Sequence, residues 1–448
     1  MSTRRLDYGS GGEIRDDFIP SDRYRSSETF ELEQENLWPR VWQIACREEE
    51  VPDVGSYALY EILDESIIIA RSSEQEIKAY YNVCQHRGRR LVDKPRGRLS
   101  NFYCRFHGWR FSLDGECIHV YSSEDWSGCP AFDQKELTLK SPQVDRWSGW
   151  VWINLDPDAA PLRDYLGLAA EKLDPFDFHE LRYKWWVTIH APVNWKVVME
   201  AFHEGYHSAA THSTRLDYEP MVAPAVAHGD HAMYFTDGWK SLSRFKTDQG
   251  AWQDIESMPE FVYQQAVELH EDLEAMVLDP LMTAIRRMYE ETPADASPET
   301  VSQKIWELHK EELEATGAKW PEKLTPEHMA SAGTSWHLFP NTIVLPNPDG
   351  VLWYRMRPDR HDPDRCIFDI WCLARYAKGK EPKVEPIVFD GFEEARDANT
   401  FLSQDFDNML AVNEGMKSRG WSGARANPVQ EVCVVNFHRA LDRYLLAK

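Results

Sequence analysis

A short segment with two cysteines and two histidines constrains the fold of this chain more than any other part of its sequence. The segment CQHRGRRLVDKPRGRLSNFYCRFH, residues 84–107, begins with a Cys-x-His pair (Cys84, His86) and ends with a Cys-x-x-His pair (Cys104, His107). Seventeen residues separate the two pairs, and each pair has its thiol before its imidazole. If the four side chains share one site, the chain must fold so that two short, similar loops face each other.

Two kinds of metal centre combine thiolate with imidazole ligands, namely zinc sites and mixed-ligand [2Fe–2S] clusters. Zinc sites pair ligands of one kind, with about two to four residues within a cysteine pair and about three to five within a histidine pair. Each loop here carries one ligand of each kind, which favours a cluster in which one iron takes both sulfurs and the other takes both nitrogens. Gly88 and Gly108 follow the histidines closely, where a loop must turn tightly.

The segment resembles a Rieske centre. Rieske proteins of respiratory complexes carry one more cysteine in each loop, and these two cysteines form a disulfide. This chain has other residues at those places, Arg89 in the first loop and Arg105 and Phe106 in the second. The resemblance therefore implies a centre of the type found in Rieske ferredoxins and oxygenases. A stand-alone ferredoxin needs only about 100 residues, so a pure electron carrier would leave most of these 448 residues unexplained.

A second motif, HEGYH, is spelled like the helix of a zinc peptidase. On this hypothesis His203 and His207 bind zinc from one helical face, and Glu204 is the general base. A third ligand is then needed, but Ala210 and Ser213 stand where the HExxHxxGxxH peptidases require Gly and His. The zinc peptidase is therefore an alternative that the cluster motif does not support.

The same segment suits an oxygenase that binds iron through His207 and His212. Residues five positions apart on a helix point about 140° away from each other. The helix must therefore end or bend between the two histidines, which the intervening sequence SAAT permits. One carboxylate would complete the triad of two histidines and one carboxylate that holds non-haem Fe(II) and leaves positions open for dioxygen.

The stretch NWKVVMEAFHEGYHSAATH, which ends at His212, resembles the catalytic motif of Rieske oxygenase α subunits, the aromatic-ring-hydroxylating dioxygenase family. Two residues depart from the family pattern, since Glu204 stands where the family often has Asp and Ala201 where it often has Asn. The family's third iron ligand lies far downstream, in a segment that resembles FLSQDFDNMLAVNEGMKSRG. The resemblance implies Asp405 as this ligand, with Asp407 as a rival on another side of the helix.

The resemblance also implies how the two metals are linked. Glu204 corresponds to a carboxylate that bridges a Rieske histidine and an iron-ligand histidine. In the toroidal trimers of the family, that Rieske centre belongs to the neighbouring subunit. His203 is expected to be packed or hydrogen-bonded rather than catalytic, and Tyr206 either supports a ligand or packs.

The remaining sequence predicts an α+β fold in two domains. Alternating apolar and polar residues within 41–157 predict the short strands of a small antiparallel β domain that holds the Rieske [2Fe–2S] cluster. Residues 158–448 combine strands with long helices, one of them predicted over residues 261–291. They resemble the helix-grip fold of the catalytic domain of oxygenase large subunits. Residues 1–40 are predicted to form an N-terminal arm and a helix packed on the catalytic domain.

Charge and hydropathy limit the partners of the chain. The formal net charge of −24 argues against nucleic acid and anionic membranes. No run of about 18 apolar residues could span a membrane, and the N-terminus is unlike a signal peptide, so a cytoplasmic protein is predicted. Residues 87–110 are an exception, with eight Lys and Arg and a single acid, Asp93. This basic region either docks an acidic electron donor such as a ferredoxin or pairs with internal acids, and both can hold at once.

Together with the resemblance, the sequence predicts the oxygenase component of a multi-component enzyme. Electrons from NAD(P)H would arrive through a separate reductase, with or without a ferredoxin, because the chain has no Gly-rich nucleotide motif. The expected reaction uses O2 for cis-dihydroxylation or monooxygenation of an aromatic or bulky apolar substrate, with oxidative O- or N-dealkylation as the alternative. The family resemblance implies a homotrimer, alone or as α3β3 with a small subunit.

Overall fold

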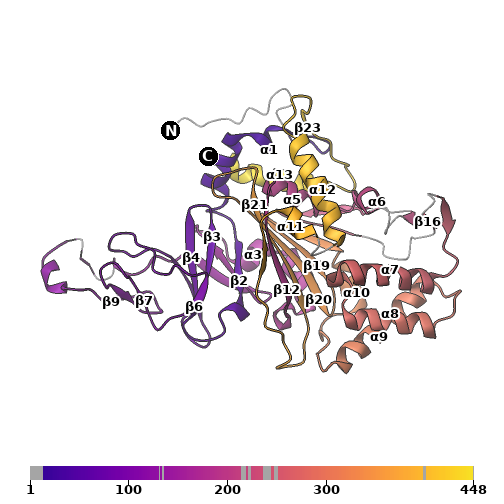
Figure 1. The fold of residues 1–448 in the computed structure, drawn as a ribbon, viewed down its shortest axis with the longest axis horizontal. Helices are drawn as coiled ribbons and strands as arrows, with labels where there is room; N and C mark the ends of the chain where they lie inside the picture. The colour runs from indigo at the N-terminus through magenta and orange to yellow at the C-terminus, as the bar shows by residue number, and fades with distance from the viewer. Residues whose placement is uncertain are drawn as a thin grey trace. The chain divides into compact units, whose positions relative to one another are not determined.

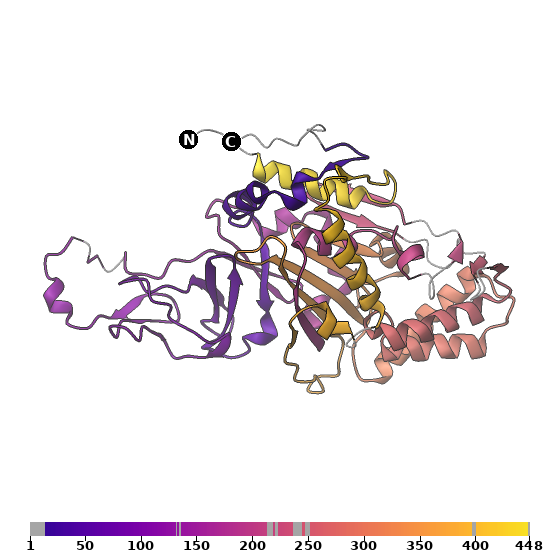
Figure 2. The same cartoon turned by 45° about the horizontal axis from the view of Figure 1, so that its top comes forward.

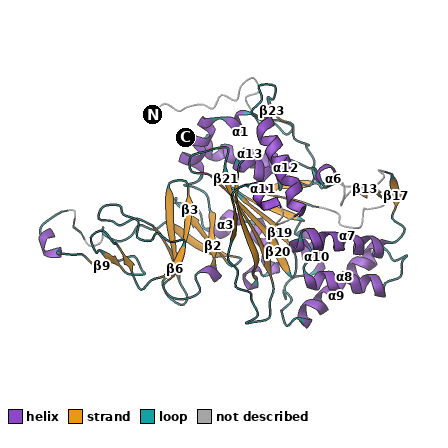
Figure 3. Ribbon diagram, in the orientation of Figure 1, coloured by secondary structure: helices purple, strands orange, loops and turns teal. Residues whose placement is uncertain are grey.

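The structure divides into two compact units. It is a computed structural model that describes residues 14–130, 132–133, 136–212, 218–219, 223–235, 244–246, 251–396 and 400–446. The smaller unit comprises residues 34–165, and the larger unit combines the described parts of residues 1–33 and 166–448 (Figure 1). The first 13 residues of the predicted arm lie outside the described residues. Figure 3 shows helices and sheets in the larger unit and mainly strands in the smaller, so the predicted α+β class is confirmed. The domain boundaries predicted after residues 40 and 157 stay predictions.

The smaller unit is built from three small antiparallel sheets. Their strands, in spatial order, are β5 (Ile77–Tyr81), β4 (Glu65–Arg71), β3 (Ser56–Ile62) and β6 (Arg96–Arg98); β10 (Gln143–Trp147), β11 (Trp150–Asn154) and β2 (Gln43–Arg47); and β7 (Phe102–Tyr103), β8 (Arg110–Phe111) and β9 (Cys117–His119). The core of this unit includes Cys84 and Cys104, each 2 % exposed. Both thiols are therefore buried at the ends of loops that short strands hold in place.

An eight-stranded sheet forms the centre of the larger unit. Its strands, in spatial order, are β14 (Ala225–His228), β15 (His231–Tyr234), β18 (Ser335–Leu338), β19 (Thr342–Pro346), β20 (Gly350–Pro358), β21 (Cys366–Ala374), β12 (Arg182–Ala191) and β22 (Ile387–Phe389). Neighbouring strands are antiparallel except β22, which runs parallel to β12. Smaller sheets pair β1 (Ile19–Pro20) with β23 (Gly423–Ala424) and join β13 (Tyr218–Glu219), β16 (Arg244–Lys246) and β17 (Trp252–Asp254).

Two helices distant in sequence lie together on this sheet. Helix α5 (Trp195–Ala201) packs on β20 and β21, and α12 (Thr400–Gly415) packs on α5 (Figures 1 and 2). Helix α13 (Val432–Leu445) contacts β14 and β15. Further short helices are α3 (Leu162–Leu166), α4 (Leu168–Leu173), α6 (Ser208–Thr211), α10 (Pro326–Ser331) and α11 (Phe392–Ala395). The packing of α12 on α5 brings the two segments with predicted iron ligands side by side.

The prediction of a single helix over residues 261–291 is wrong. The structure has two helices there, α7 (Met258–Asp272) and α8 (Asp279–Glu291). Pro280 explains the break, because it lies in the first turn of α8, where its missing N–H costs nothing, whereas in a continuous helix it would remove a hydrogen bond. With α9 (Pro298–Ala315) they form a group with its own apolar core. Of the helices described, none is long and apolar enough to cross a membrane.

A buried ion pair anchors the N-terminal segment on α5. This segment forms α1 (Asp22–Arg25) and α2 (Ser27–Leu32). Directly after them, Glu33 accepts hydrogen bonds from Lys196 Nζ at 2.7 Å and from Trp195 Nε1 at 2.9 Å. The side chains of Glu33 and Lys196 are 0 % and 2 % exposed. Because α5 leads directly into HEGYH, the anchor fixes the helix that precedes the predicted iron ligands.

Replacing Glu33 by Ala is expected to lower the free energy of unfolding of the larger unit by about 3–5 kcal/mol, because the buried Lys196 ammonium loses its counter-charge. Chemical denaturation followed by tryptophan fluorescence measures this change. The double variant Glu33→Leu/Lys196→Met should recover most of the loss, since apolar residues of similar volume replace the pair. A loss below about 1 kcal/mol for Glu33→Ala, as for a surface pair, would contradict the buried geometry.

Candidate metal centres

The two Cys/His loops have the same backbone geometry. In each loop the cysteine N–H donates to the carbonyl five residues later, at 2.9 Å from Cys84 and 2.8 Å from Cys104. The cysteine carbonyl accepts the N–H of a glycine four residues later, at 3.0 Å in both loops. These glycines, Gly88 and Gly108, have φ angles of +75° and +73°, which residues with a Cβ rarely adopt. The loops thus repeat one turn, which presents equivalent atoms to a shared centre.

The structure brings the predicted cluster ligands together in pairs. Burial, reinforced by the neighbouring thiol of Cys104, raises the pKa of Cys84 to about 11. The rings of His86 and His107 meet edge to face, with centroids 4.6 Å apart. His86 also stacks flat on Trp109 at 4.8 Å and meets Trp126 edge to face at 5.8 Å. Two thiols and two imidazoles therefore face a common region from the two loops.

The imidazole nitrogens fit a bound inorganic group. Nδ1 of His86 and Nδ1 of His107 are buried, and neither has a hydrogen-bond partner within the described part of the chain. Because an unpaired buried polar atom costs about 1–3 kcal/mol, both nitrogens suit ligation to a group outside the polypeptide. Among the described residues, only one group of three ligand side chains has its atoms within 4.8 Å of one another, and it lies elsewhere. The two pairs are thus too far apart for one zinc ion and suit the two irons of a [2Fe–2S] cluster.

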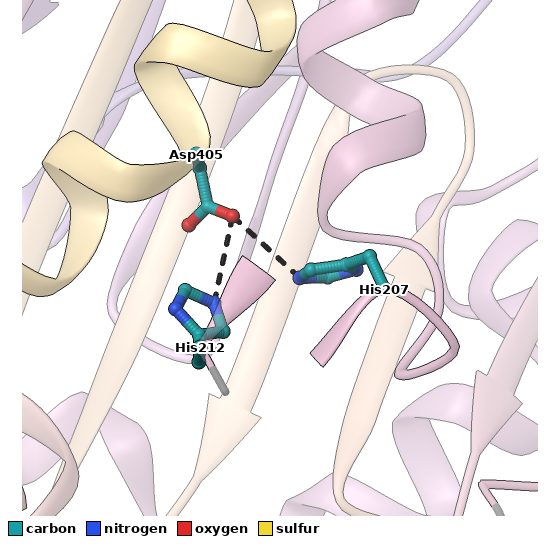
Figure 4. A group of neighbouring side chains, drawn as sticks. All are labelled: His207, His212 and Asp405. Atoms are coloured by element: carbon teal, nitrogen blue, oxygen red, sulfur yellow. Dashed lines mark ion pairs between the residues drawn. The ribbon is translucent and has the colours of Figure 1, made fainter. Parts of the chain in front are cut away.

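That other group consists of His207, His212 and Asp405 (Figure 4). Nε2 of His207 lies 3.6 Å and Nε2 of His212 3.5 Å from Oδ1 of Asp405. Burial raises the pKa of Asp405 to about 7, and its Oδ2 is buried without a partner among the described residues. A buried carboxylate that has no Lys or Arg partner among the described residues, and that faces two imidazole nitrogens, suits a divalent metal ion.

The backbone breaks between α5 and the two histidines, and the separate turn α6 lies between His207 and His212. Helix α5 ends at Ala201, and His207 and His212 flank the single turn of α6 as its N-cap and C-cap. The expectation that HEGYH lies on a helix is therefore wrong, because the helix ends before the motif. Gly205 lies within the break, where a Cβ atom would be 2.8 Å from the Cβ of Ala223.

In both His207 and His212, the Nδ1 atom, which is not the nitrogen that faces Asp405, lies against an acceptor oxygen. Oε1 of Glu204 lies 2.8 Å from Nδ1 of His207, while Oε2 accepts the backbone N–H of His207 at 3.0 Å and that of Tyr206. Oε1 of Gln404 lies 2.7 Å from Nδ1 of His212. Glu204 was predicted to contact an iron-ligand histidine, whereas Gln404 was not predicted, and only its position next to Asp405 could have suggested it. Tyr206 is 54 % exposed in the single chain, so its role stays a prediction.

The rival carboxylate, Asp407, lies elsewhere. Its two oxygens accept hydrogen bonds from Arg396 at 2.6 and 3.0 Å, and its side chain is 56 % exposed. The Arg396 hydrogen bonds lower the pKa of Asp407. Of the two candidates, Asp405 is the one that faces the histidines.

The geometry contradicts the zinc-peptidase alternative. His203 is 1 % exposed, and its ring packs 4.0 Å from that of His337, away from the group of His207, His212 and Asp405. Burial lowers the pKa of His203 to about 3, so the ring is neutral. His203 and His207 therefore do not share a helical face or a metal.

One aromatic ring contacts the second centre, and three others pack together beside the motif. Phe401 stacks on His212 with centroids 4.0 Å apart and planes 14° apart. Phe202, next to the motif, contacts Tyr354 at 4.7 Å and Phe368 at 5.6 Å. Burial, reinforced by the charge of Asp405, raises the pKa of Tyr354. The sequence did not single out these rings, because aromatic residues are common throughout the chain.

Two family models match this chain. Residues 178–447 match "Ring hydroxylating alpha subunit (catalytic domain)", and residues 41–131 match "Rieske [2Fe-2S] domain". The carnitine monooxygenase oxygenase subunit of Escherichia coli (strain K12) is 32 % identical over 235 residues, which are 52 % of this chain and 62 % of that protein. The chain thus matches less than two thirds of the length of this relative.

Solved structures share the fold over nearly the whole chain. A quaternary ammonium Rieske monooxygenase, solved with insights into carnitine oxidation and inter-subunit electron transfer, has a TM-score of 0.64, with 17 % identity, 99 % of this chain covered and 100 % of that chain. Naphthalene 1,2-dioxygenase with indole in its active site has a TM-score of 0.64, with 19 % identity and coverage of 98 % and 95 %. The chain belongs to the family of ring-hydroxylating oxygenase α subunits, with a Rieske [2Fe–2S] domain followed by the catalytic domain.

Proposed function

We propose that this chain is the terminal oxygenase of a multi-component system that oxidises an organic substrate with O2 and electrons from NAD(P)H. The observation that carries the proposal is the convergence of His207, His212 and Asp405 on one point. The same chain holds two matched Cys/His loops, so it has residues for an electron store and for a site of oxygen activation. A cytoplasmic location is proposed with it, because NAD(P)H is the electron source.

Each proposed ligand has a defined role. Cys84, His86, Cys104 and His107 hold the Rieske cluster, and His207, His212 and Asp405 hold Fe(II). When bound, the cluster supplies single electrons, and the Fe(II) supplies open positions for dioxygen beside the substrate. The protein's own contribution is the orientation of the imidazoles. Because the Nδ1 atoms of His207 and His212 point at acceptor oxygens, each ring carries its proton there and leaves the Nε2 lone pair facing Asp405.

Glu204 is the proposed link between the two metals. It contacts His207 on one side, and we infer that its second histidine partner is a Rieske histidine of another copy of the chain. A solved quaternary ammonium Rieske monooxygenase with inter-subunit electron transfer shares the fold and supports this inference. The inference requires an oligomer, and the family resemblance makes it a homotrimer, with or without a small subunit.

The substrate has two candidate classes. The rings around the iron site suit an aromatic or bulky apolar substrate, and naphthalene 1,2-dioxygenase shares the fold. Carnitine monooxygenase is a relative by sequence, which favours monooxygenation of a quaternary ammonium compound with loss of an N-alkyl group. Aromatic rings serve both classes, because they pack on apolar guests and attract cations through their faces.

Metal and product analysis test the proposed function. An oxygenase should contain about three irons and about two acid-labile sulfides per chain, two irons from the cluster and one from the triad. The purified protein, with a surrogate reductase and ¹⁸O2, would be offered aromatic acids, polycyclic arenes, sterols and carnitine. Two labelled oxygens in a ring product indicate dihydroxylation, and an aldehyde released from an N-alkyl group indicates dealkylation. A protein with the cluster but no third iron would contradict the proposal.

The structure separates the basic region of residues 87–110 into two sets. Four of its arginines pair with acids on the same unit: Arg89 with Asp93, Arg90 with Glu61, Arg96 with Glu50 and Arg98 with Asp53. Arg87, Arg105 and Arg110 are exposed and have no acid partner among the described residues. Arg87 lies over Phe106 and Arg110 over Tyr103, rings that are 52 % and 45 % exposed. We propose that this second set, at the cluster loops, docks the acidic electron donor.

Arg105→Glu is expected to slow reduction of the cluster by an acidic [2Fe–2S] ferredoxin about 10-fold at low salt, because docking loses a steering charge. Stopped-flow absorption measures the rate, and the difference should shrink as salt screens the charges. Arg98→Glu is the matched control, since it makes the same charge change at an arginine that is already paired. Equal slowing in both variants would mean that only net charge matters and would contradict the proposed docking surface.

A further inference from the structure

One face of α12 carries Asp405 together with the side chains that contact His212 and Thr211. Phe401, Gln404, Asp405 and Asn408 are spaced as i, i+3, i+4 and i+7, so they lie on the same side of the helix. Phe401 stacks on His212, Gln404 accepts from His212, and Asp405 faces both histidines. Nδ2 of Asn408 donates to Oγ1 of Thr211 at 3.0 Å. Helix α12 therefore supplies the carboxylate that faces Nε2 of His212 and also contacts the ring and the Nδ1 atom of the same histidine.

The contact between Gln404 and His212 defines a tautomer. Nε2 of His212 faces Asp405 and must keep its lone pair to bind a metal, so the ring proton is on Nδ1. Gln404 then has to present its oxygen rather than its amide nitrogen, which agrees with the 2.7 Å contact from Oε1. His212 is 2 % exposed, so water cannot easily replace this acceptor.

We propose that Gln404 is a positioning residue that fixes the tautomer and ring orientation of His212 and so strengthens metal binding at the triad. The inference rests on the proposed function, since it assumes that His207, His212 and Asp405 hold a metal. Glu204 does the same for His207 through a carboxylate. The Glu204 carboxylate and the Gln404 amide therefore differ by one negative charge.

This difference has a physical reason. A divalent ion is balanced by the carboxylates of Asp405 and Glu204, which are 3 % and 7 % exposed. A second supporting carboxylate would add another negative charge to a largely buried site, which would destabilise the fold whenever the site is empty. An amide at position 404 supplies the same acceptor atom without the charge.

Cobalt binding to the full chain, with its cluster in place and the mononuclear site emptied, tests the proposal. Calorimetric titration with Co²⁺ alone is expected to show about 10- to 100-fold weaker binding for Gln404→Leu, as for other outer partners of metal ligands. Gln404→Glu keeps the acceptor oxygen and is expected to bind Co²⁺ at least as tightly as the parent. Asn408→Leu, which loses a hydrogen bond on the same helix face without touching a ligand, should stay within about threefold of the parent. The electron paramagnetic resonance spectrum of bound Co²⁺ should change only in Gln404→Leu and Gln404→Glu.

Three outcomes would overturn the proposal: unchanged affinity in Gln404→Leu, an equal loss in Asn408→Leu, or no rescue by Gln404→Glu. If Gln404→Leu does not fold, Gln404→Asn decides, because its shorter amide cannot reach Nδ1 and the affinity should again fall. The parent and Asp405→Ala separate this inference from the proposed function. Failure of the parent to bind one Co²⁺, or unchanged binding by Asp405→Ala, would refute the metal triad itself and the inference with it.

Discussion

Replacing Asp405 by Ala should remove the mononuclear iron and leave the Rieske cluster intact. Asp405 is the only carboxylate that meets both His207 and His212 among the described residues, and two imidazoles alone bind Fe(II) weakly. Iron should fall from about three to about two per chain, with about two sulfides retained. Substrate oxidation should fall below detection, while the visible and electron paramagnetic resonance spectra of the cluster stay unchanged.

Asp407→Ala is the matched control. It removes an exposed carboxylate two residues away that pairs with Arg396, so it should keep about three irons and nearly full activity. If Asp407→Ala lost the third iron and Asp405→Ala kept it, the ligand assignment would have to move to Asp407. Loss of the cluster in Asp405→Ala would show that the two centres are not independent.

Cys104→Ala should abolish the Rieske cluster and leave the mononuclear site able to bind metal. Cys104 is 2 % exposed, and its thiol meets that of Cys84, so one iron would lose half of its protein ligands. Iron should fall from about three to about one per chain, and the brown colour should disappear. The smaller unit should also unfold at a lower temperature, because metal binding contributes to folding where ligands are buried in a small core.

Cys117→Ala measures how much of the lost stability comes from packing in the core rather than from loss of the cluster. Cys117 is a 5 % exposed thiol in the same apolar core, and it is not a predicted ligand. Its replacement should cost about 1 kcal/mol of stability and leave the cluster spectrum unchanged. A cluster that survived in Cys104→Ala, or was lost equally in Cys117→Ala, would contradict the ligand set.

The cluster loops could be predicted from the sequence because their geometry is local. Each loop is a turn of a few residues whose hydrogen bonds close around Cys84 or Cys104, with Gly88 or Gly108 at a positive φ. The order of residue types therefore carries most of the structural information. The match of residues 41–131 to the Rieske domain agrees with this prediction.

Helix ends were predicted less well, because they depend on competition between neighbouring segments. Periodicity alone extended one helix across residues 261–291, although Pro280 marks the start of a second helix. Similarly, HEGYH is spelled like a helical motif, but the chain leaves α5 at Ala201, where Gly205 then packs closely on Ala223. A pattern of residue types cannot by itself show which of two possible helix ends the packing selects.

The sequence by itself indicated which residue types suit each proposed metal centre, because the chemistry of thiolate, imidazole and carboxylate ligands depends on the side chains alone. It also indicated the family, through motifs that are contiguous in the chain. Only the tertiary structure distinguished Asp405 from Asp407, separated the paired from the unpaired arginines of residues 87–110, and placed Gln404 against His212. These distinctions required the packing of α12 on α5, which joins segments about 200 residues apart. A helix face, an ion pair and a hydrogen bond are properties of distances in space, and spacing along the chain does not fix those distances.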